Sequence, residues 1–227
     1  MYENYEYVRP ADIEKESMRI IEAELRERGI EIPQENMTVV KRVIHTSADF
    51  DYGTNLKFTE GAVQRAVEAL RAGNSTFITD TNMALSGISK PSLARLSSQA
   101  VCYMADEEIM KQAKEQGTTR AYASMRRGAA EHPYGIFVSG NAPTALIALS
   151  EMIRDGLRPT LVIGVPVGFV NVVESKEEIF EICKEHDIPA IVAFGRKGGS
   201  NVAASICNAL LYSAVDMVDP IKRGWQK

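Results

Sequence analysis

The sequence predicts an α/β fold with a mostly parallel sheet, and two observations predict it. Short apolar segments alternate with amphipathic segments through the C-terminal half of the chain, which is the pattern of consecutive βαβ units. The chain has 227 residues, of which 45% are apolar and 25% charged, a balance typical of a globular protein with a sizeable core. We therefore expect one domain over residues 1–227, Rossmann-like, with three layers and helices on both faces of the sheet.

The N-terminal half predicts helices and strands in turn. Pro10 to Arg28 repeats apolar residues at helical intervals and stops at Gly29, which predicts an amphipathic helix. The β-branched segment from Thr38 to Ile44 (TVVKRVI) predicts a strand that ends at His45. The next predicted elements are a helix at Thr59 to Ala72, a strand at Thr76 to Thr79, a strand at Ala100 to Met104 and a helix at Asp106 to Glu115.

The C-terminal half predicts three β–α units. Right-handed crossovers place the C-terminal ends of parallel strands on one edge of the sheet, where open α/β sheets bind ligands. The polar residues that follow these strands are therefore the candidates for a site. The predicted strands are Gly135 to Ser139, Thr160 to Val165 and Ala190 to Phe194, and the helices are Thr144 to Arg154, Lys176 to Glu185 and Ser200 to Leu211.

Composition excludes several classes of protein. The net charge of −4 argues against a general nucleic-acid binder. No segment approaches the ~20 consecutive apolar residues of a membrane span, and the polar N-terminus does not resemble a signal peptide. Three widely spaced cysteines predict reduced thiols, and the three histidines lack metal-ligand spacing. We expect a cytoplasmic protein with no membrane or nucleic-acid partner and no metal site.

His45 is the candidate for proton transfer. A histidine at the ligand-facing end of a strand can titrate near neutral pH and move protons; the alternative is a surface or capping histidine. Arg42 lies three residues upstream, and residues three apart in a strand point to opposite faces. Both could still meet one ligand if the strand ends or bends between them. Otherwise Arg42 is an ordinary exposed base.

Two strand-to-helix loops are candidates for binding an anion. Gly140 to Thr144 (GNAPT) predicts a helix start with free N–H groups, although a well-made helix start without a ligand fits equally. Gly195 to Ser200 (GRKGGS) combines three glycines with two cations, which favours a carboxylate or phosphate. Neither loop has the spacing of a dinucleotide or P-loop motif. Residues alone do not name the reaction.

Several short motifs occur in a fixed order along nearly the whole chain. They are Ile13-Glu14 with Ser17, then RVIHTS (42–47), TDTNM (79–83), Thr119-Arg120, GNAPTAL (140–146), IGVPVGFV (163–170), ESK (174–176), GRKGGS (195–200) and Asn208-Ala209-Leu210. Each is common, but all of them in this order resemble the precorrin-8X methylmutase family, including its cobalt-precorrin-8 branch. Asn171-Val172-Val173 departs from the small residues usual in the family, which affects loop packing rather than the histidine motif.

The resemblance implies an isomerase of cobalamin biosynthesis. It implies an intramolecular transfer of a methyl group from C-11 to C-12 of precorrin-8X or cobalt-precorrin-8, which gives hydrogenobyrinate or cobyrinate. It implies no cofactor, because cobalt, if present, is carried by the substrate, and a homodimer with its pocket near the subunit boundary. The family's invariant histidine falls on His45, and its substrate-contacting serine and arginine fall on Ser17 and Arg42.

A flat apolar macrocycle ringed by carboxylates needs an apolar cleft with cations or free N–H groups around it. Together with the resemblance, this requirement predicts a set of substrate-binding residues, namely Ser17, Arg42, Thr81, Arg120, Asn141, Thr144, Arg196, Lys197 and Ser200. Two other functions stay open. A corrinoid carrier without catalysis would use the same pocket but would not need His45. An unrelated α/β enzyme acting on a nucleotide or sugar phosphate rests on the Gly195 to Ser200 loop alone.

Overall fold

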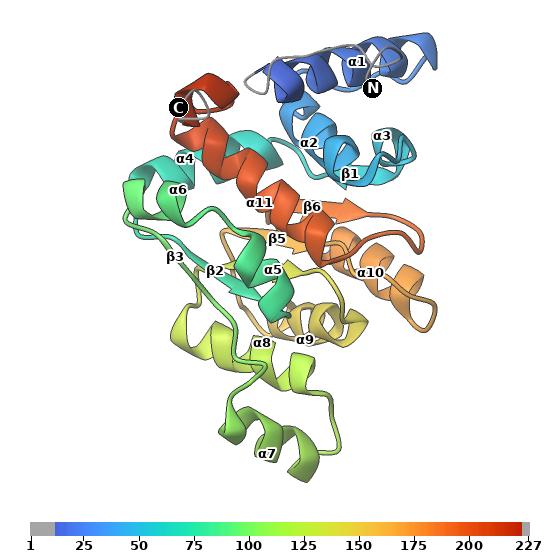
Figure 1. Ribbon diagram of the computed structural model, residues 1–227. Helices are drawn as coiled ribbons and strands as arrows, with labels where there is room; N and C mark the ends of the chain where they lie inside the picture. The colour runs from blue at the N-terminus through green and yellow to red at the C-terminus, as the bar shows by residue number, and fades with distance from the viewer. Residues whose placement is uncertain (1–11, 224–227) are drawn as a thin grey trace, which may run out of the picture.

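The computed structural model describes residues 12–223, and these form the α/β fold that the sequence predicts (Figure 1). A six-stranded sheet in the order β1-β6-β5-β4-β2-β3 lies at the centre. Five neighbouring strands are parallel, and the edge strand β1 pairs antiparallel with β6. The strands are β1 (Leu56–Phe58), β2 (Thr76–Thr79), β3 (Gln99–Val101), β4 (Ile136–Ser139), β5 (Leu161–Gly164) and β6 (Ala190–Ala193).

The strand order reverses direction between β2 and β4. From β2 the chain moves outward to β3, then crosses back to pair β4 with the other side of β2 and continues through β5 to β6. Such a reversal opens a crevice at the C-terminal ends of the two strands, where ligands of open α/β sheets bind. The residues directly after β2 and β4, beginning with Asp80 and Gly140, lie at this position.

Helices cover both faces of the sheet. Successive side chains of a strand point to opposite faces, and Phe77 of β2 accordingly joins one core cluster while Ile78 joins the other. One face carries α2 (Met37–Ser47), α4 (Ala62–Ala72), α5 (Asn82–Gly87), α6 (Lys90–Arg95) and α11 (Ser200–Ala214), with α1 (Ile13–Glu27) packed outside α2. The other face carries α8 (Arg120–Glu131), α9 (Pro143–Arg154) and α10 (Val172–Glu185), with α7 (Glu107–Glu115) packed outside α8.

The predicted strand from Thr38 to Ile44 is wrong, because this segment is helix α2. Its buried residues are Val39, Val40, Val43 and Ile44, which recur at intervals of one and four and so follow the helical period. β-branched residues favour strands only weakly, and burial of this stripe against α11 outweighs that preference. The helix ends at Ala48, whose φ of 53° is left-handed.

The other predicted elements are present, with ends that differ by a few residues; the predicted helix from Pro10 to Arg28 is α1, and Pro10 itself lies outside the described residues. Helix α10 begins at Val172 rather than Lys176, and α4 begins at Ala62 rather than Thr59. The sequence patterns did not predict α8, the short helices α5 and α6, the four-residue helix α3 (Tyr52–Asn55), or β1. The final described element is the 3-10 helix η2 (Pro220–Arg223). No helix in residues 12–223 is long and apolar enough to cross a membrane.

Candidate active site

Asp80 occupies the crevice between β2 and β4. Its side chain is fully buried and accepts hydrogen bonds from three consecutive backbone N–H groups, those of Gly140 (2.8 Å), Asn141 (2.8 Å) and Ala142 (2.7 Å). The Ser139 hydroxyl lies 3.2 Å from the same carboxyl group. Burial raises the pKa of this carboxyl, and these hydrogen bonds oppose the rise because they favour the charged form.

The expected anion site at Gly140 to Thr144 is therefore filled from within the chain. The N–H groups that precede α9 do bind a carboxylate, as helix starts favour, but the carboxylate is that of Asp80 rather than of a ligand. Asn141 contributes its backbone N–H to this arrangement, while its residue as a whole is exposed. Only its side chain is left to meet a substrate.

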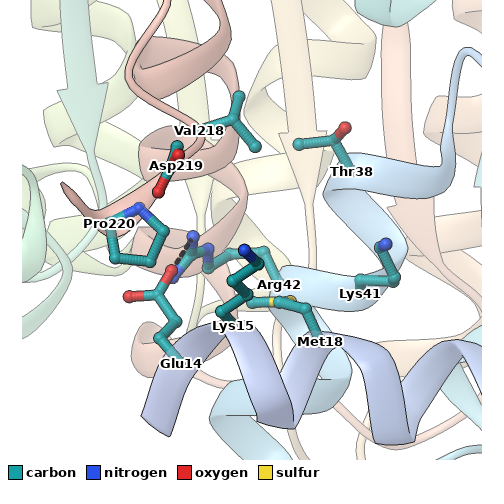
Figure 2. A pocket seen from close by; sticks show the side chains of 9 residues that line it. All are labelled: Glu14, Lys15, Met18, Thr38, Lys41, Arg42, Val218, Asp219 and Pro220. Carbon is teal, nitrogen blue, oxygen red and sulfur yellow. Dashed lines mark hydrogen bonds and ion pairs between the residues drawn. The ribbon is translucent and has the colours of Figure 1, made fainter. Parts of the chain in front are cut away.

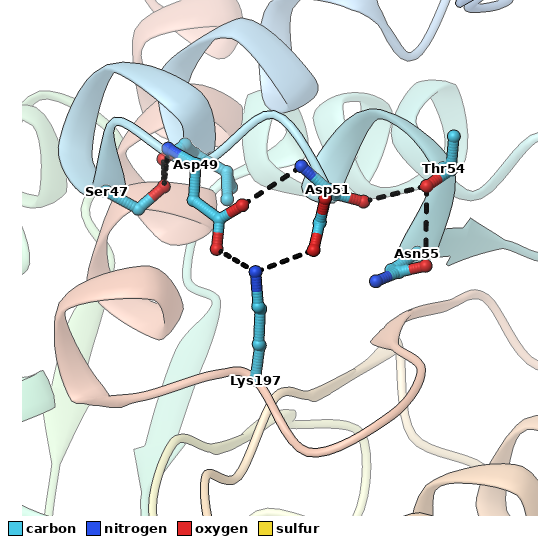
Figure 3. A network of polar contacts seen from close by, with 7 residues as sticks. Ser47, Asp49, Asp51, Thr54, Asn55 and Lys197 are labelled. Carbon is cyan, nitrogen blue, oxygen red and sulfur yellow. Dashed lines mark hydrogen bonds and ion pairs between the residues drawn. The ribbon is translucent and has the colours of Figure 1, made fainter.

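The glycine-rich loop between β6 and α11 is tied to the chain that follows His45 (Figure 3). Lys197 Nζ lies 2.7 Å from a carboxylate oxygen of Asp49 and 2.6 Å from one of Asp51. The hydrogen bond from Lys197 is the main cause that lowers the pKa of Asp49. The cation expected to bind substrate carboxylates thus has two internal carboxylate partners.

Arg196 has a different setting from Lys197. It is exposed, and its guanidinium lies 5.4 Å from the ring centroid of Phe169, which is 81% exposed in the loop after β5. A cation beside an exposed aromatic ring and the neighbouring exposed Val170 forms a surface that is both apolar and positive. Such a surface suits an apolar ligand with acidic substituents.

Lys176 holds the same loop from inside the protein. Its side chain is fully buried in the first turns of α10, and Nζ donates to the carbonyl oxygens of Gly195 and Lys197, both at 2.8 Å. Desolvation lowers the pKa of this amine to about 8. Lys176 belongs to the ESK motif (174–176), from which the sequence predicted no role for it. Its helical spacing from Val172 and Ile179, which puts a lysine on the buried face of α10, is the sequence pattern that could have revealed it.

Two hydroxyl pairs join predicted site residues to other elements. Thr81, which caps α5, lies 2.8 Å from Ser200 at the start of α11. Thr144 in the first turn of α9 lies 2.7 Å from Thr119, which caps α8. The exposed Arg120 follows Thr119 and so stands beside the start of α9. These residues therefore meet at the edge formed by strand C-termini and helix starts.

His45 lies in the last turn of α2 rather than at a strand end. Because α2 is a helix, Arg42 and His45 share one face, and the expectation that they point to opposite sides is wrong. Partial desolvation, followed by repulsion from the Arg42 guanidinium, lowers the pKa of the exposed His45 imidazole. The lowered pKa makes the protonated form of the imidazole a stronger acid than ordinary imidazolium.

Arg42 takes part in an ion pair at a pocket between α1, α2 and the C-terminal segment (Figure 2). Its guanidinium lies 2.6 Å from Glu14, with both side chains largely buried, and faces the Tyr212 ring at 5.3 Å. Arg223 pairs with the same Glu14 carboxylate. The pocket has a volume of about 310 Å³. Ser17, one turn after Glu14, donates to the backbone carbonyl of Ile13 at 2.8 Å.

The predicted site residues therefore form three groups. Thr81, Ser200, Arg196 and Lys197 lie around the start of α11, and Thr144 with Arg120 lies around the start of α9. Ser17 and Arg42 belong to the layer of α1 and α2, which reaches the first group through Asp49 and Asp51. Among residues 12–223, no three His, Cys, Asp or Glu side chains are grouped to hold a metal ion.

Comparison with known proteins decides the family. The family model described as precorrin-8X methylmutase matches residues 12–213. The chain is a precorrin-8X methylmutase family member. It is 40% identical to the cobalt-precorrin-8 methylmutase of Priestia megaterium over 204 residues, 89% of this chain and 88% of the relative. It is 46% identical to the cobalt-precorrin-8 methylmutase of Salmonella typhimurium over 175 residues, 77% of this chain and 80% of the relative.

The fold of a solved family member agrees with this assignment. The precorrin-8X methylmutase structure from Thermus thermophilus superposes with a TM-score of 0.79 at 37% identity, covering 90% of this chain and 98% of that one. The sequence prediction of the family is confirmed, and with it that of an isomerase that migrates a methyl group in cobalamin biosynthesis. The matches give no support to a corrinoid carrier or to a nucleotide enzyme.

Proposed function

We propose that this methylmutase acts as an intramolecular transferase on cobalt-precorrin-8, moving the ring-C methyl group from C-11 to C-12 and giving cobyrinate. The cobalt form is proposed because the Priestia and Salmonella relatives both carry that name, whereas the Thermus structure is named for precorrin-8X. The reaction changes no oxidation state overall. We propose that the protein needs no cofactor or metal of its own, and that cobalt arrives in the substrate.

His45 is the proposed acid–base residue, and its setting at the end of α2 is the observation that carries this proposal. The His45 residue is exposed at the surface, and the lowered pKa of its imidazole makes the protonated form a ready proton donor. Migration of the methyl group changes the conjugation of the macrocycle. A proton given by the imidazolium to the macrocycle favours the shift, and the neutral imidazole retakes it afterwards.

Binding of the macrocycle is proposed at the apolar, cationic surface near the start of α11. Exposed Phe169 and Val170 offer apolar contact, and Arg196 and Arg120 offer charge for the acetate and propionate groups. The side chains of Thr81, Asn141, Thr144 and Ser200 supply hydrogen-bonding groups at the same edge. Ser17 completes the proposed set on the side of α1.

Arg42 and Lys197 are less available to a substrate than the other predicted binding residues. Each already pairs with a carboxylate of the chain, Arg42 with Glu14 and Lys197 with Asp49 and Asp51. A substrate carboxylate reaches either cation only by exchange with that internal partner or by sharing it. We propose that the two cations contribute mainly to the shape and charge of the site.

We also propose a homodimer with its pocket near the subunit boundary, and a cytoplasmic location. Ile13 and Ile20 on α1 are about half exposed and stand on one helix face with Ser17 between them, which supports an apolar contact there. Light scattering after size-exclusion chromatography tests the assembly, and a monomer at micromolar concentration contradicts it. Cell fractionation tests the location.

The deciding experiment mixes the purified protein with cobalt-precorrin-8 and, separately, with precorrin-8X, and follows the visible spectrum. We expect conversion of both and a higher kcat/KM for the cobalt form. His45→Ala is expected to bind the macrocycle but to lose turnover by roughly 10²–10⁴-fold. The matched control is His132→Ala, since His132 precedes β4 at the opposite edge of the sheet.

Full turnover by His45→Ala contradicts the acid–base role while leaving the isomerase intact. A higher kcat/KM for precorrin-8X contradicts the proposed substrate. Turnover that survives exhaustive chelation supports the absence of a resident metal, and loss of turnover that added metal restores contradicts it.

A further inference from the structure

We propose that Lys176 is a positioning residue for the methyl shift. Through two carbonyl oxygens it fixes the β6–α11 loop that presents Arg196, and through Lys197 it fixes the chain segment that follows His45. The inference rests on the proposed roles of Arg196 and His45 and goes beyond them, because Lys176 itself touches neither a substrate nor the imidazole.

The first support is that Lys176 is buried without a carboxylate. Its side chain is fully buried, and none of the ion pairs among residues 12–223 includes it. Removal of an ammonium group from water is costly unless hydrogen bonds replace the lost hydration. An apolar side chain of similar length would fill the same space on the buried stripe of α10 without that cost. Packing alone therefore does not account for a lysine here.

The second support is the position in the loop of the two carbonyl oxygens that accept hydrogen bonds from Lys176. Nζ donates at 2.8 Å to the carbonyl oxygens of Gly195 and of Lys197, which flank Arg196 in the loop. With both carbonyls held toward the interior, the intervening Arg196 side chain stands on the outer surface beside Phe169. The position of one buried amine thus determines which way the loop presents its cation.

The third support is the continuation of these contacts toward His45. Lys197, whose carbonyl Lys176 holds, places its own Nζ within 2.7 Å of both Asp49 and Asp51 (Figure 3). Asp49 follows the end of α2 and lies four residues after His45. One continuous set of polar contacts therefore runs from α10 through the loop to the end of the helix that carries the imidazole.

The backbone of the loop leaves little room for another arrangement. A Cβ at Gly198 would lie 2.1 Å from the carbonyl oxygen of Val165, and the N–H of Gly199 donates to that same oxygen at 2.9 Å. The loop is therefore fixed at Gly198 and Gly199 by Val165, the residue directly after β5, and at Gly195 and Lys197 by Lys176. Loss of the amine leaves Arg196 held by one longer backbone contact, from the N–H of Gly168 to its carbonyl oxygen at 3.3 Å, and so loosens this half of the loop.

The test compares Lys176→Met and Lys176→Gln with wild type, and uses Lys184→Met as the matched control. Lys184 lies on the same helix, but its side chain is exposed. Hydrogen–deuterium exchange without substrate is measured on peptides that cover residues 194–201. We expect faster exchange in Lys176→Met, an intermediate rate in Lys176→Gln, which keeps one donor group, and the wild-type rate in Lys184→Met.

Steady-state kinetics provide the second readout. We expect Lys176→Met to lower kcat/KM by roughly 10- to 100-fold, with a rise in KM from the misplaced Arg196 and a fall in kcat from the loosened end of α2. A purely structural role would lower only the active fraction, so kcat would fall with the thermal stability while KM stayed constant. That result overturns the proposal, as does unchanged exchange over residues 194–201.

Folding failure is also decisive. If Lys176→Met does not fold, Lys176→Gln carries both measurements, and if neither folds, Lys176 is a residue of the core and the proposal is wrong. Exchange is measured without turnover. If wild type converts neither macrocycle, the proposed function fails, and the exchange data still decide whether Lys176 holds the loop.

Discussion

The loops after β4 and β6 occupy equivalent places in the fold, but other parts of the chain bind their backbones in opposite ways. Each joins a parallel strand to a helix, each begins with glycine, and each was a candidate for binding an anion, although for the first a helix start without a ligand fitted equally. After β4, the backbone N–H groups of Gly140, Asn141 and Ala142 are occupied by the Asp80 carboxylate. After β6, the backbone carbonyls of Gly195 and Lys197 are occupied by the Lys176 amine.

The difference shows that a partner from another element decides what a loop can bind. The Asp80 carboxylate, which follows β2, accepts hydrogen bonds from the N–H groups of the first loop and so attaches this loop to the sheet. The buried Lys176 amine on α10 donates to carbonyl oxygens of the second loop, and the Arg196 side chain stays exposed, where a ligand can reach it. We infer that the first loop contributes stability and the second contributes recognition.

The largest expected effect on stability comes from Asp80→Ala. The change leaves three N–H groups without their acceptor, of which that of Gly140 is buried and the other two are partly buried, so we expect a loss of about 3 kcal/mol in the free energy of unfolding. Chemical denaturation measures it. The control is Asn141→Ala, which keeps the backbone donor and removes only an exposed side chain, with an expected loss below about 0.5 kcal/mol. Equal losses of unfolding free energy in the two variants would contradict the stabilising role of the Asp80 carboxylate in the first loop.

The second effect contrasts a glycine in each loop. A Cβ at Gly198 would lie 2.1 Å from a backbone carbonyl oxygen, whereas a Cβ at Gly140 would lie 2.9 Å from the Cα of Ser200 and 3.0 Å from the Ala203 side chain. We expect Gly198→Ala to cost about 2–3 kcal/mol and to lower kcat/KM, and Gly140→Ala to cost about 1 kcal/mol with less effect on kcat/KM. Denaturation and kinetics on both variants test the order, which the reverse ranking would contradict.

The third effect concerns Lys197→Met. Exposed ion pairs contribute little to stability, so we expect a small change in Tm at neutral pH together with a fall in kcat, since the segment after His45 loses its anchor. Unchanged kcat would show that the second loop does not act through α2. Lys57→Met on the exposed side of β1 is the control.

The same variant has a pH signature. Lys197 lowers the pKa of Asp49 in the folded protein below its ordinary value of 3.8. A lowered carboxyl pKa contributes stability above the unfolded-state pKa, and this contribution disappears as pH falls through the folded-state pKa. The difference in unfolding free energy between wild type and Lys197→Met should therefore shrink below about pH 4. A difference that is constant from pH 6 to pH 3 contradicts this assignment.

The smallest effect is on the titration of His45. Repulsion from the Arg42 guanidinium contributes to its lowered pKa, so Arg42→Met should raise the His45 pKa toward the ordinary value. An NMR titration of the imidazole measures the change, and Arg126→Met on the distant helix α8 should leave it unaltered. A lower pKa in Arg42→Met would mean that the lost charge also reorganises the Glu14 cluster.

The sequence by itself determined five of the six strands, the order of most βαβ units, and the family, because apolar periodicity and a fixed order of motifs are local properties of the chain. It also placed Thr81, Asn141 and Arg196 just after strands, whose ends the crossover rule brings to one edge of the sheet, but it placed His45 at a strand end that is the end of a helix. The helix at Met37–Ser47 was within reach of the same reasoning, since its buried residues follow the helical period. The β-branched residues of that segment favoured a strand instead, and this led to the wrong prediction.

Only the tertiary structure decided which charges are free. Asp80 and the N–H groups around Asn141 are 60 or so positions apart in the chain, and Lys197 is paired across nearly 150 positions with Asp49 and Asp51. No local pattern encodes such pairs, because they depend on which strand ends and helix starts the fold brings together. Two of the predicted cations, Arg42 and Lys197, are thereby paired, and Arg196 is left on the surface beside Phe169.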